Sequence, residues 1–237
     1  MQNSGDRIIQ HLRTVAFERL RRSADPELAR RVDAIKHFQH ARFQQSYAKL
    51  LADPRYGRAA RFFLDDLYGP RDFADRDRQF ERVVPALVRL FSRDIVTTVG
   101  ELAELHALSE TLDSTMASLL DALPLQWPGY ARAWQATGAA PSRYRQIKLL
   151  HDIGLALDRY TRKPLLRHSL SLMRKPARLA GIGDLQAFLE KGFDTFAEMQ
   201  GASTFLKVIV EHETALARRL FEVDATAMPD AYPGELP

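Results

Sequence analysis

The sequence predicts an all-α protein, a multi-helix bundle of about nine helices joined by short loops. Apolar residues recur at intervals of three and four along most of the chain, and no segment shows the alternation of a half-buried strand. Proline, glycine and capping residues divide this pattern into segments of helical length. We therefore expect one helical domain over residues 1–222 and an irregular, proline-containing tail over 223–237.

The first half of the chain is expected to hold five helices. They span about residues 6–21, 26–51, 60–67, 72–91 and 93–122. Asp25 precedes Pro26, a capping carboxylate followed by proline at the first helical position. Asp72 is expected to cap the fourth helix, and Pro85 to kink it. The first helix, within residues 1–22, could also detach and serve as an arm on a partner.

The second half is expected to hold four or five helices, some of them short. They span about residues 128–137, 143–161, 164–173, 184–200 and 203–221, with a turn of helix and a loop over 175–183. Ser142, Asp184 and Ser203 are the predicted caps, and Pro164 is expected to open its helix.

Composition excludes several kinds of site. The chain of 237 residues has no cysteine, which rules out disulfides, cysteine nucleophiles and cysteine-ligated clusters. The net charge is only +4, from 34 basic and 30 acidic residues. The charges come in blocks, basic over 1–93, acidic over 94–124, basic over 125–178 and acidic over 179–237. This alternation favours pairing between helices, with a nucleic-acid-binding face over 143–178 as a weaker alternative.

Neither a secretory signal nor a membrane span is evident. The first twenty residues carry several charges and no apolar core. No stretch approaches the roughly 18 apolar residues of a transmembrane helix. The cytoplasm is therefore the expected location.

Polar residues inside apolar stripes are the best candidates for a site. On the helix of 93–122, His106 and Asp113 fall within the inward arc, and Glu110 lies at its edge. On the last helix, Glu213 lies near the centre of the inward face and His212 flanks it. Buried carboxylates need donors, so a hydrogen-bonded network that joins His106 to Asp113 or Glu213, completed by an arginine, is the first interpretation. The alternative is a metal, haem or small-ligand site, with His106, Glu110 and Glu213 as possible metal ligands.

Recognised catalytic patterns are absent. No glutamate has a histidine three residues later, and His212-Glu213 is not followed by the rest of a zinc-protease motif. There is no nucleophile elbow and no phosphate-binding glycine loop. We therefore predict no catalytic residue.

The segment from Phe62 to Asp77 is the most distinctive of the chain. It reads as a helix end, a Gly-Pro turn and the start of a new helix. Charged residues are dense enough to pair across this corner, and two aromatic residues could instead contact a partner. The residues concerned are Asp65, Asp66, Tyr68, Arg71, Asp72, Phe73, Arg76 and Asp77.

The same segment carries a resemblance. Phe-Phe-Leu-x-Asp-Leu-Tyr-Gly-Pro-x-Asp-Phe, followed by Arg-Asp, resembles the signature of a family of uncharacterised proteobacterial all-helical proteins. Parts of residues 173–199 are similar to that family too. The resemblance implies a bacterial, soluble, helical protein, and it implies no activity and no cofactor.

Three functions remain open at this point. The first is a non-enzymatic interaction or regulatory role, through a protein partner or self-association, since no catalytic pattern exists. The second is a helical bundle that holds a metal, haem or small ligand near His106, Asp113 and Glu213. The third is weak nucleic-acid binding through 143–178.

Overall fold

The computed structural model describes residues 4–67, 69, 73–222 and 224. Its described elements are all helices, which confirms the all-α prediction. The α-helices are α1 Ser4–Ala24, α2 Pro26–Ser46, α3 Ala48–Ala52, α4 Gly57–Phe62, α5 Ala74–Leu90, α6 Arg93–Ser118, α7 Trp127–Ala136, α8 Ala140–Thr161, α9 Pro164–Leu172, α10 Arg174–Leu179, α11 Gly183–Glu198 and α12 Ser203–Glu222. A π-helical turn, η1 (Phe63–Leu67), continues α4. The predicted tail lies outside the described residues, apart from Asp224.

Two predicted helix starts are confirmed. The Asp25 carboxylate accepts hydrogen bonds from the backbone N–H groups of Glu27 and Leu28, each at 3.1 Å, and Pro26 opens α2. Pro164 likewise opens α9. In both cases proline stands where the missing N–H would have had no partner in the helix.

Other boundaries differ from the prediction. The helix expected over 26–51 is interrupted at Tyr47, which separates α2 from α3. Ser142 does not cap α8, because that helix already begins at Ala140 with Ala139 at the N-cap. Asp184 lies inside α11, whose N-cap is Ile182, and its carboxylate accepts a hydrogen bond from Gln79 instead.

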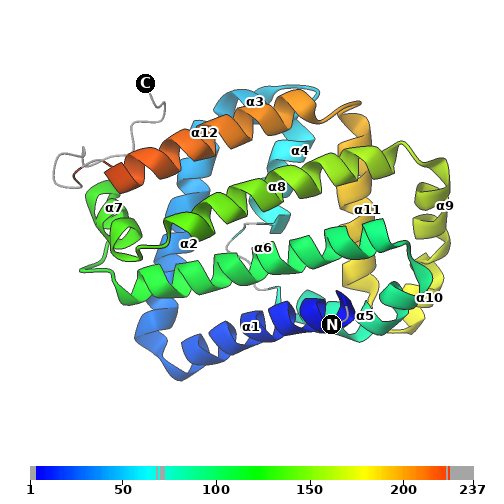
Figure 1. Cartoon of the computed structure of the whole chain (residues 1–237), viewed down its shortest axis with the longest axis horizontal. Coiled ribbons are helices and arrows are strands. Elements are labelled where there is room, and N and C mark those ends of the chain that lie inside the picture. The colour runs from blue at the N-terminus through cyan, green and yellow to red at the C-terminus, as the bar shows by residue number, and fades with distance from the viewer. Residues whose placement is uncertain (1–3, 68, 70–72, 223, 225–237) are drawn as a thin grey trace.

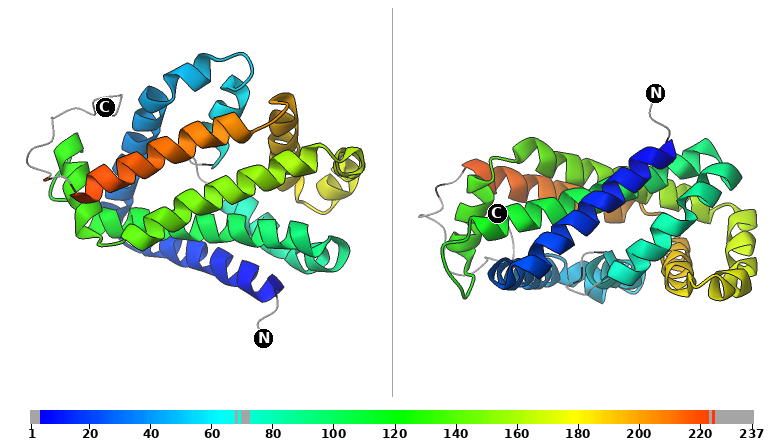
Figure 2. Two further views of the ribbon diagram at one scale, coloured as in Figure 1. Left: turned by 45° about the horizontal axis from the view of Figure 1, so that its top comes forward. Right: turned by 90° about the horizontal axis from the view of Figure 1, so that it is seen from below.

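The helices form two layers (Figures 1 and 2). In the first layer α1, α6, α8 and α12 run roughly alongside one another. Behind them α2, α4 and α11 run across that direction, and α5 runs obliquely between the two layers. At one end of the molecule α7 closes the layers, and at the other end lie α9 and α10.

The core is divided among clusters that join the layers. One cluster gathers α2, α7 and the end of α6, and another gathers α4, α8, α11 and α12. A third holds α1 against α5 and α6 through Ile8, Leu12 and Val84. Because α1 buries these residues, it is packed along the bundle in this structure; its predicted ability to detach stays a prediction.

Candidate functional site

A cavity of about 400 Å³ lies between the two layers. Side chains from α2, η1, α5 and α11 line it on one side, and side chains from α6 and α8 line it on the other. Most of this lining is apolar. The cavity is therefore a space inside the bundle that suits an apolar occupant better than water.

The cavity is long and narrow. The residues of α6 that line it extend from Ile95 to Asp113. At a rise of 1.5 Å per residue, these eighteen steps correspond to about 27 Å of helix. Because α6 and α8 run alongside each other, the lining of α8 extends over a similar length, from Arg143 to Tyr160. A volume of about 400 Å³ spread over this length has the proportions of a channel.

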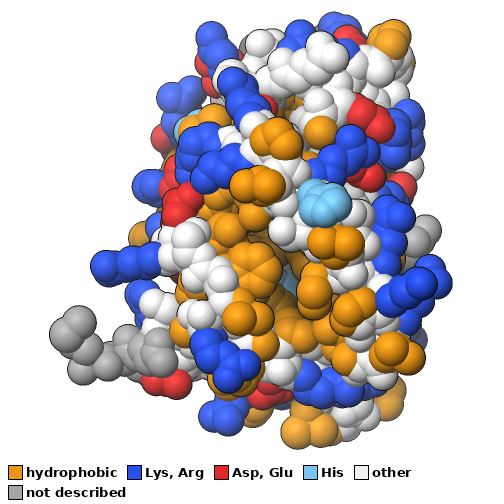
Figure 3. Space-filling model, turned by 90° about the vertical axis from the view of Figure 1, so that its right-hand side faces the viewer, with side chains coloured by type: hydrophobic (Ala, Val, Ile, Leu, Met, Phe, Trp, Pro, Cys, Tyr) orange, Lys and Arg blue, Asp and Glu red, His pale blue; other side chains and the backbone are white. Residues whose placement is uncertain are grey.

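One end of the cavity opens to the surface. Phe91, Met173 and Leu189 line the cavity and are also among the exposed large hydrophobic residues. They lie at the end of α5, after α9 and on α11. Figure 3 shows the same end of the molecule, where hydrophobic side chains gather around a hollow. We call this opening the mouth.

The opposite, inner end holds a buried arginine. Arg143, near the start of α8, is 5% exposed and lines the cavity. Its guanidinium lies 3.8 Å from the ring centroid of Trp134, and it donates to Gln146 Oε1 and to the Met116 sulfur, each at 3.1 Å. Its Nε has no hydrogen-bond partner. Among the described residues, no carboxylate forms an ion pair with it.

The charges of Asp113 and Glu213 act on Arg143, although neither carboxylate contacts it directly. Asp113, also at the inner end, accepts a hydrogen bond from Gln39 at 3.1 Å. Burial raises the pKa of Asp113, against the opposing charges of Lys36 and Arg143. Burial also lowers the pKa of Arg143 itself. The inner end thus holds a buried guanidinium that has carboxylates nearby but no ion-pair partner among the described residues.

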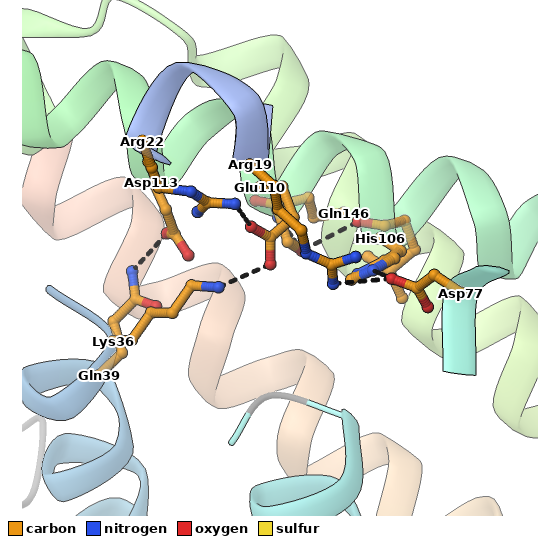
Figure 4. Close-up of polar contacts among 11 residues, drawn as sticks. Arg19, Arg22, Lys36, Gln39, Asp77, His106, Glu110, Asp113 and Gln146 are labelled. Carbon is orange, nitrogen blue, oxygen red and sulfur yellow. Dashed lines mark hydrogen bonds and ion pairs between the residues drawn. The ribbon is translucent and has the colours of Figure 1, made fainter. Parts of the chain in front are cut away.

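His106 belongs to a second polar group, farther along α6. Its Nε2 lies 2.8 Å from Asp77 Oδ2, and Arg19 reaches the same oxygen at 2.7 Å (Figure 4). Burial acts to raise the pKa of Asp77, but the hydrogen bond from His106 and the neighbouring positive charges outweigh it and lower that pKa. The predicted partner of His106 was Asp113 or Glu213, and the structure places it against Asp77 instead.

Glu110 is held by two cations. Arg22 contacts Glu110 Oε2, and Lys36 donates to Oε1 at 2.6 Å (Figure 4). Burial acts to raise the pKa of Glu110, but the charges of Lys36 and Arg22 lower it to about 2. The carboxylate therefore stays ionised and joins α1, α2 and α6.

Glu213, on α12, forms a third network, with Arg42 of α2 and with Tyr47. Arg42 donates to its two oxygens at 2.8 and 3.1 Å, and the Tyr47 hydroxyl donates to Oε1 at 2.7 Å. His212 packs edge-on against the Tyr47 ring, at 5.2 Å between ring centroids. As the sequence predicted, an arginine pairs with this buried carboxylate. His106, which was expected in the same network, is not part of it.

The predicted metal ligands are not brought together. His106, Glu110 and Glu213 each have different partners, and no three acidic or histidine side chains in the described ranges are placed to hold a metal ion. His40 and His106 line the cavity, and Nε2 of each contacts a carboxylate, that of Asp65 or Asp77. The residues present therefore do not fit a metal centre.

Comparison with known proteins gives one match. The model of a family described as a domain of unknown function, DUF8198, matches residues 18–227. The chain belongs to the DUF8198 family. No curated protein and no solved structure matches it.

The charged corner of this DUF8198 chain combines an ion pair, a hydrogen bond to the backbone and two cation–ring contacts. Lys191 reaches Asp66 at 2.5 Å, and Arg76 donates to the backbone carbonyl of Asp66 at 2.8 Å. The Arg76 guanidinium also stacks over the rings of Phe73 and Phe188, at 4.0 and 4.4 Å. Phe73, rather than the predicted Asp72, occupies the N-cap of α5. Tyr68, Arg71 and Asp72 lie outside the described residues.

Sequence reasoning missed Arg143 as a site residue of this DUF8198 domain. It was grouped with the basic block of 143–178, as part of a possible surface. A signal did exist, because Arg143 shares the helical stripe of Ile147 and Leu150, both of which line the cavity.

Proposed function

We propose that this protein binds one elongated, apolar small molecule with an acidic head group. The observation that carries the proposal is the cavity itself, an apolar channel whose inner end holds a buried arginine without a carboxylate partner. Among the alternatives raised by the sequence, this is the small-ligand hypothesis, with Arg143 in place of the predicted cluster of His106, Asp113 and Glu213 as the group that holds the ligand.

The apolar walls favour an apolar body for the ligand. Small-molecule sites are usually concave and lined by apolar side chains, with a few polar groups that fix orientation. The cavity matches this description, since Leu102, Leu150 and Phe193 are part of its lining and the polar groups gather toward its inner end. A chain-like ligand fits a channel of this length, whereas a compact one would leave much of it empty.

The isolated arginine favours an acidic head. Removing a guanidinium from water is costly unless a counter-charge or hydrogen-bond acceptors replace the lost hydration. Gln146 and Met116 supply two neutral contacts, and Nε remains without one. A carboxylate at this position would accept two parallel hydrogen bonds from the planar guanidinium and supply the missing negative charge.

Haem and metal ions fit the site less well. A haem requires an axial protein ligand, and Nε2 of each cavity histidine already contacts a carboxylate. A metal ion requires several oxygen or nitrogen ligands that converge, and the carboxylates of α6 are instead held by arginine and lysine.

Binding of matched acids and alcohols tests the proposal. Protein stripped of bound ligands is titrated with palmitic acid and with hexadecanol, by displacement of a fluorescent fatty acid. A charge-assisted hydrogen bond contributes about 1.5–3 kcal/mol, so we expect the acid to bind roughly ten to a hundred times more tightly.

Two variants locate the head group. Arg143→Met should abolish most of the preference for the acid, because the apolar walls remain and the charge is gone. Arg145→Met is the matched control, since Arg145 pairs with Glu104 and is not among the lining residues. Absence of binding by either ligand, or an acid preference unchanged in Arg143→Met, contradicts the proposal.

A further inference from the structure

Large apolar side chains are exposed to solvent at the end of the molecule where the mouth lies. Helix α9 has no buried residue, although it contains four leucines. Leu165 is 80% exposed and Leu172 is 63% exposed, and in α10 Leu179 is 90% exposed. Single exposed leucines are ordinary, but a group of them beside an apolar opening marks a surface that meets something apolar.

Basic residues accompany these leucines. Between Asp158 and Asp184 the sequence has seven lysines and arginines and no acidic residue: Arg159, Arg162, Lys163, Arg167, Arg174, Lys175 and Arg178. Three of them, Arg159, Arg167 and Arg174, pair with carboxylates of neighbouring helices, but Lys175 and Arg178 form no ion pair within the described part of the chain. Figure 3 shows Lys and Arg side chains around the hydrophobic ones on this face. We call the exposed leucines and bases of α9 and α10 the mouth face.

We propose that the mouth face docks on the surface of an anionic lipid bilayer. Exposed leucines that enter the boundary between head groups and acyl chains, flanked by bases that meet anionic head groups, are the features of an interfacial membrane contact. Docking would place the opening of the channel against the bilayer, so that an apolar molecule could pass between them without crossing water. None of the described helices has the length and apolar character needed to cross the bilayer, so the contact is one of surface docking.

The chemistry of the face favours a bilayer over a nucleic acid. Nucleic-acid contacts rely on arginine and lysine with aromatic or polar side chains, and large exposed leucines add nothing to phosphate binding. The part of the basic block that lies at the inner end is also unavailable, because Arg143 is buried and Arg145 pairs with Glu104. Within the basic block of 143–178, the large exposed leucines, Leu165 and Leu172, lie on α9, beside the bases of α9 and α10.

Flotation with lipid vesicles tests this proposal on the full chain. The protein is mixed with vesicles of phosphatidylcholine alone or of phosphatidylcholine with phosphatidylglycerol, and the bound fraction is measured at low and high salt. Each lysine or arginine near an anionic leaflet raises partitioning roughly fivefold. We therefore expect binding to the anionic vesicles at least tenfold stronger than to the neutral ones, and weaker at high salt.

Paired variants separate the mouth face from other surfaces. Leu165→Asp with Leu172→Asp should reduce binding to anionic vesicles at least tenfold, and so should Lys175→Glu with Arg178→Glu. The matched controls are Phe17→Asp with Leu20→Asp on α1, which are also exposed, and Lys207→Glu with Arg218→Glu on α12. The controls should bind within about twofold of the unchanged chain, a difference too small to count as loss of a charge contact.

Three outcomes would overturn the proposal. The first is equal binding to neutral and anionic vesicles, or none to either. The second is loss of binding in the control variants to the same extent as in the mouth-face variants. The third is a dimer in light scattering without lipid that the leucine variants dissociate, which would assign the face to a second copy of the chain. Fatty-acid binding is measured without vesicles, so failure of docking and failure of the cavity proposal are distinguishable.

Discussion

Two buried arginines of this protein differ in one respect, the presence of a carboxylate. Arg42 donates to both oxygens of Glu213 on α12, whereas Arg143 contacts only a neutral amide, a sulfur and a ring. The charge of Glu213 raises the pKa of Arg42 against the effect of burial, and burial lowers that of Arg143. Within the described residues, the first arginine thus has an ion-pair partner and the second has none.

Substitution of each arginine by methionine should therefore have different effects on stability. Arg42→Met leaves the buried Glu213 carboxylate without its counter-charge, and we expect a loss of about 3–5 kcal/mol in the free energy of unfolding. Arg143→Met removes a charge that has no ion-pair partner, and we expect a change within about 1 kcal/mol, or a gain, because buried charges are often replaced by apolar side chains without loss. Urea unfolding of the ligand-free protein measures both. A larger loss for Arg143→Met than for Arg42→Met would show that Arg143 is structural.

Glu110 gives a prediction for the dependence of stability on pH. Its pKa is lowered to about 2 in the folded protein, from an ordinary value of 4.5. Stability from this group is therefore fully present above pH 4.5 and is lost as the pH falls toward 2. Glu110→Gln leaves Arg22 and Lys36 without their carboxylate, so it should destabilise the protein by roughly 3 kcal/mol at pH 7.

The same variant should differ less from the unchanged chain as the medium becomes acidic. As the pH falls below 4.5, the unchanged chain progressively loses the stabilisation from the Glu110 carboxylate, which the variant already lacks. The unfolding temperatures of the two proteins should therefore converge. Thermal unfolding at a series of pH values checks this. A difference between the two that stays constant down to pH 2 would contradict the assigned ion pairs.

At the scale of the elements, α8 and α12 pack closely at one glycine. A Cβ atom at Gly154 would lie 2.4 Å from Leu206 Cδ2. Leu206 is fully buried, so it has no free space into which to move. Gly154→Ala should therefore cost about 1–3 kcal/mol through overpacking, despite the better helix propensity of alanine.

Gly100 in α6 provides the matched control. A Cβ there would meet Ile8 Cγ1 at 3.7 Å, an ordinary van der Waals distance. Gly100→Ala should stabilise the protein by up to about 1 kcal/mol, since glycine is a poor helix former. Thermal melts of the two variants should shift in opposite directions. A stabilising Gly154→Ala would mean that α8 and α12 lie farther apart than the structure has them.

The elements also show what the sequence could predict. The capping carboxylate Asp25 and the opening Pro164 are local signals, and both starts are confirmed. The break at Tyr47 is marked by no proline or glycine in the sequence, and the Tyr47 hydroxyl bonds to the distant Glu213 on α12. Ser142 looked like a cap, but Pro141 and Ala140 are already in the helix, since proline is accepted in a first turn. Local signals located helices well and their ends less well.

For the candidate site, the sequence predicted residues but not partners. Helical periodicity placed His106, Glu110, Asp113 and Glu213 on inward faces, where the structure has them partly or fully buried. Their partners come from α1, α2 and α5, and periodicity within one helix carries no information about which helix lies opposite. The cavity could not be predicted for the same reason, since it depends on how completely two facing stripes fill the space between them.

The whole molecule is a two-layer bundle that encloses a channel. The channel is polar at its buried inner end and apolar at the mouth, where it reaches the surface. The first layer supplies α6 and α8 to the channel, the second supplies α2, η1 and α11, and α5 contributes from between them. Charged groups that hold the layers together, such as Glu110 with Arg22 and Lys36, lie along the inner half. The leucines and unpaired bases lie at the opposite end, on α9 and α10. The head group of the proposed ligand would therefore lie at the inner end of the channel, and the proposed membrane contact would lie at the mouth.

The channel also makes the protein sensitive to hydrostatic pressure. Unfolding eliminates internal voids, so a protein with large voids loses volume when it unfolds, and typical losses are about 20–100 mL/mol. A cavity of about 400 Å³ should place this chain near the upper end of that range. We expect the ligand-free protein to unfold at a lower pressure than its complex with palmitic acid, followed by tryptophan fluorescence of Trp127 and Trp134. The pressure at which the protein unfolds would thus show, without an added label, whether a ligand occupies the channel.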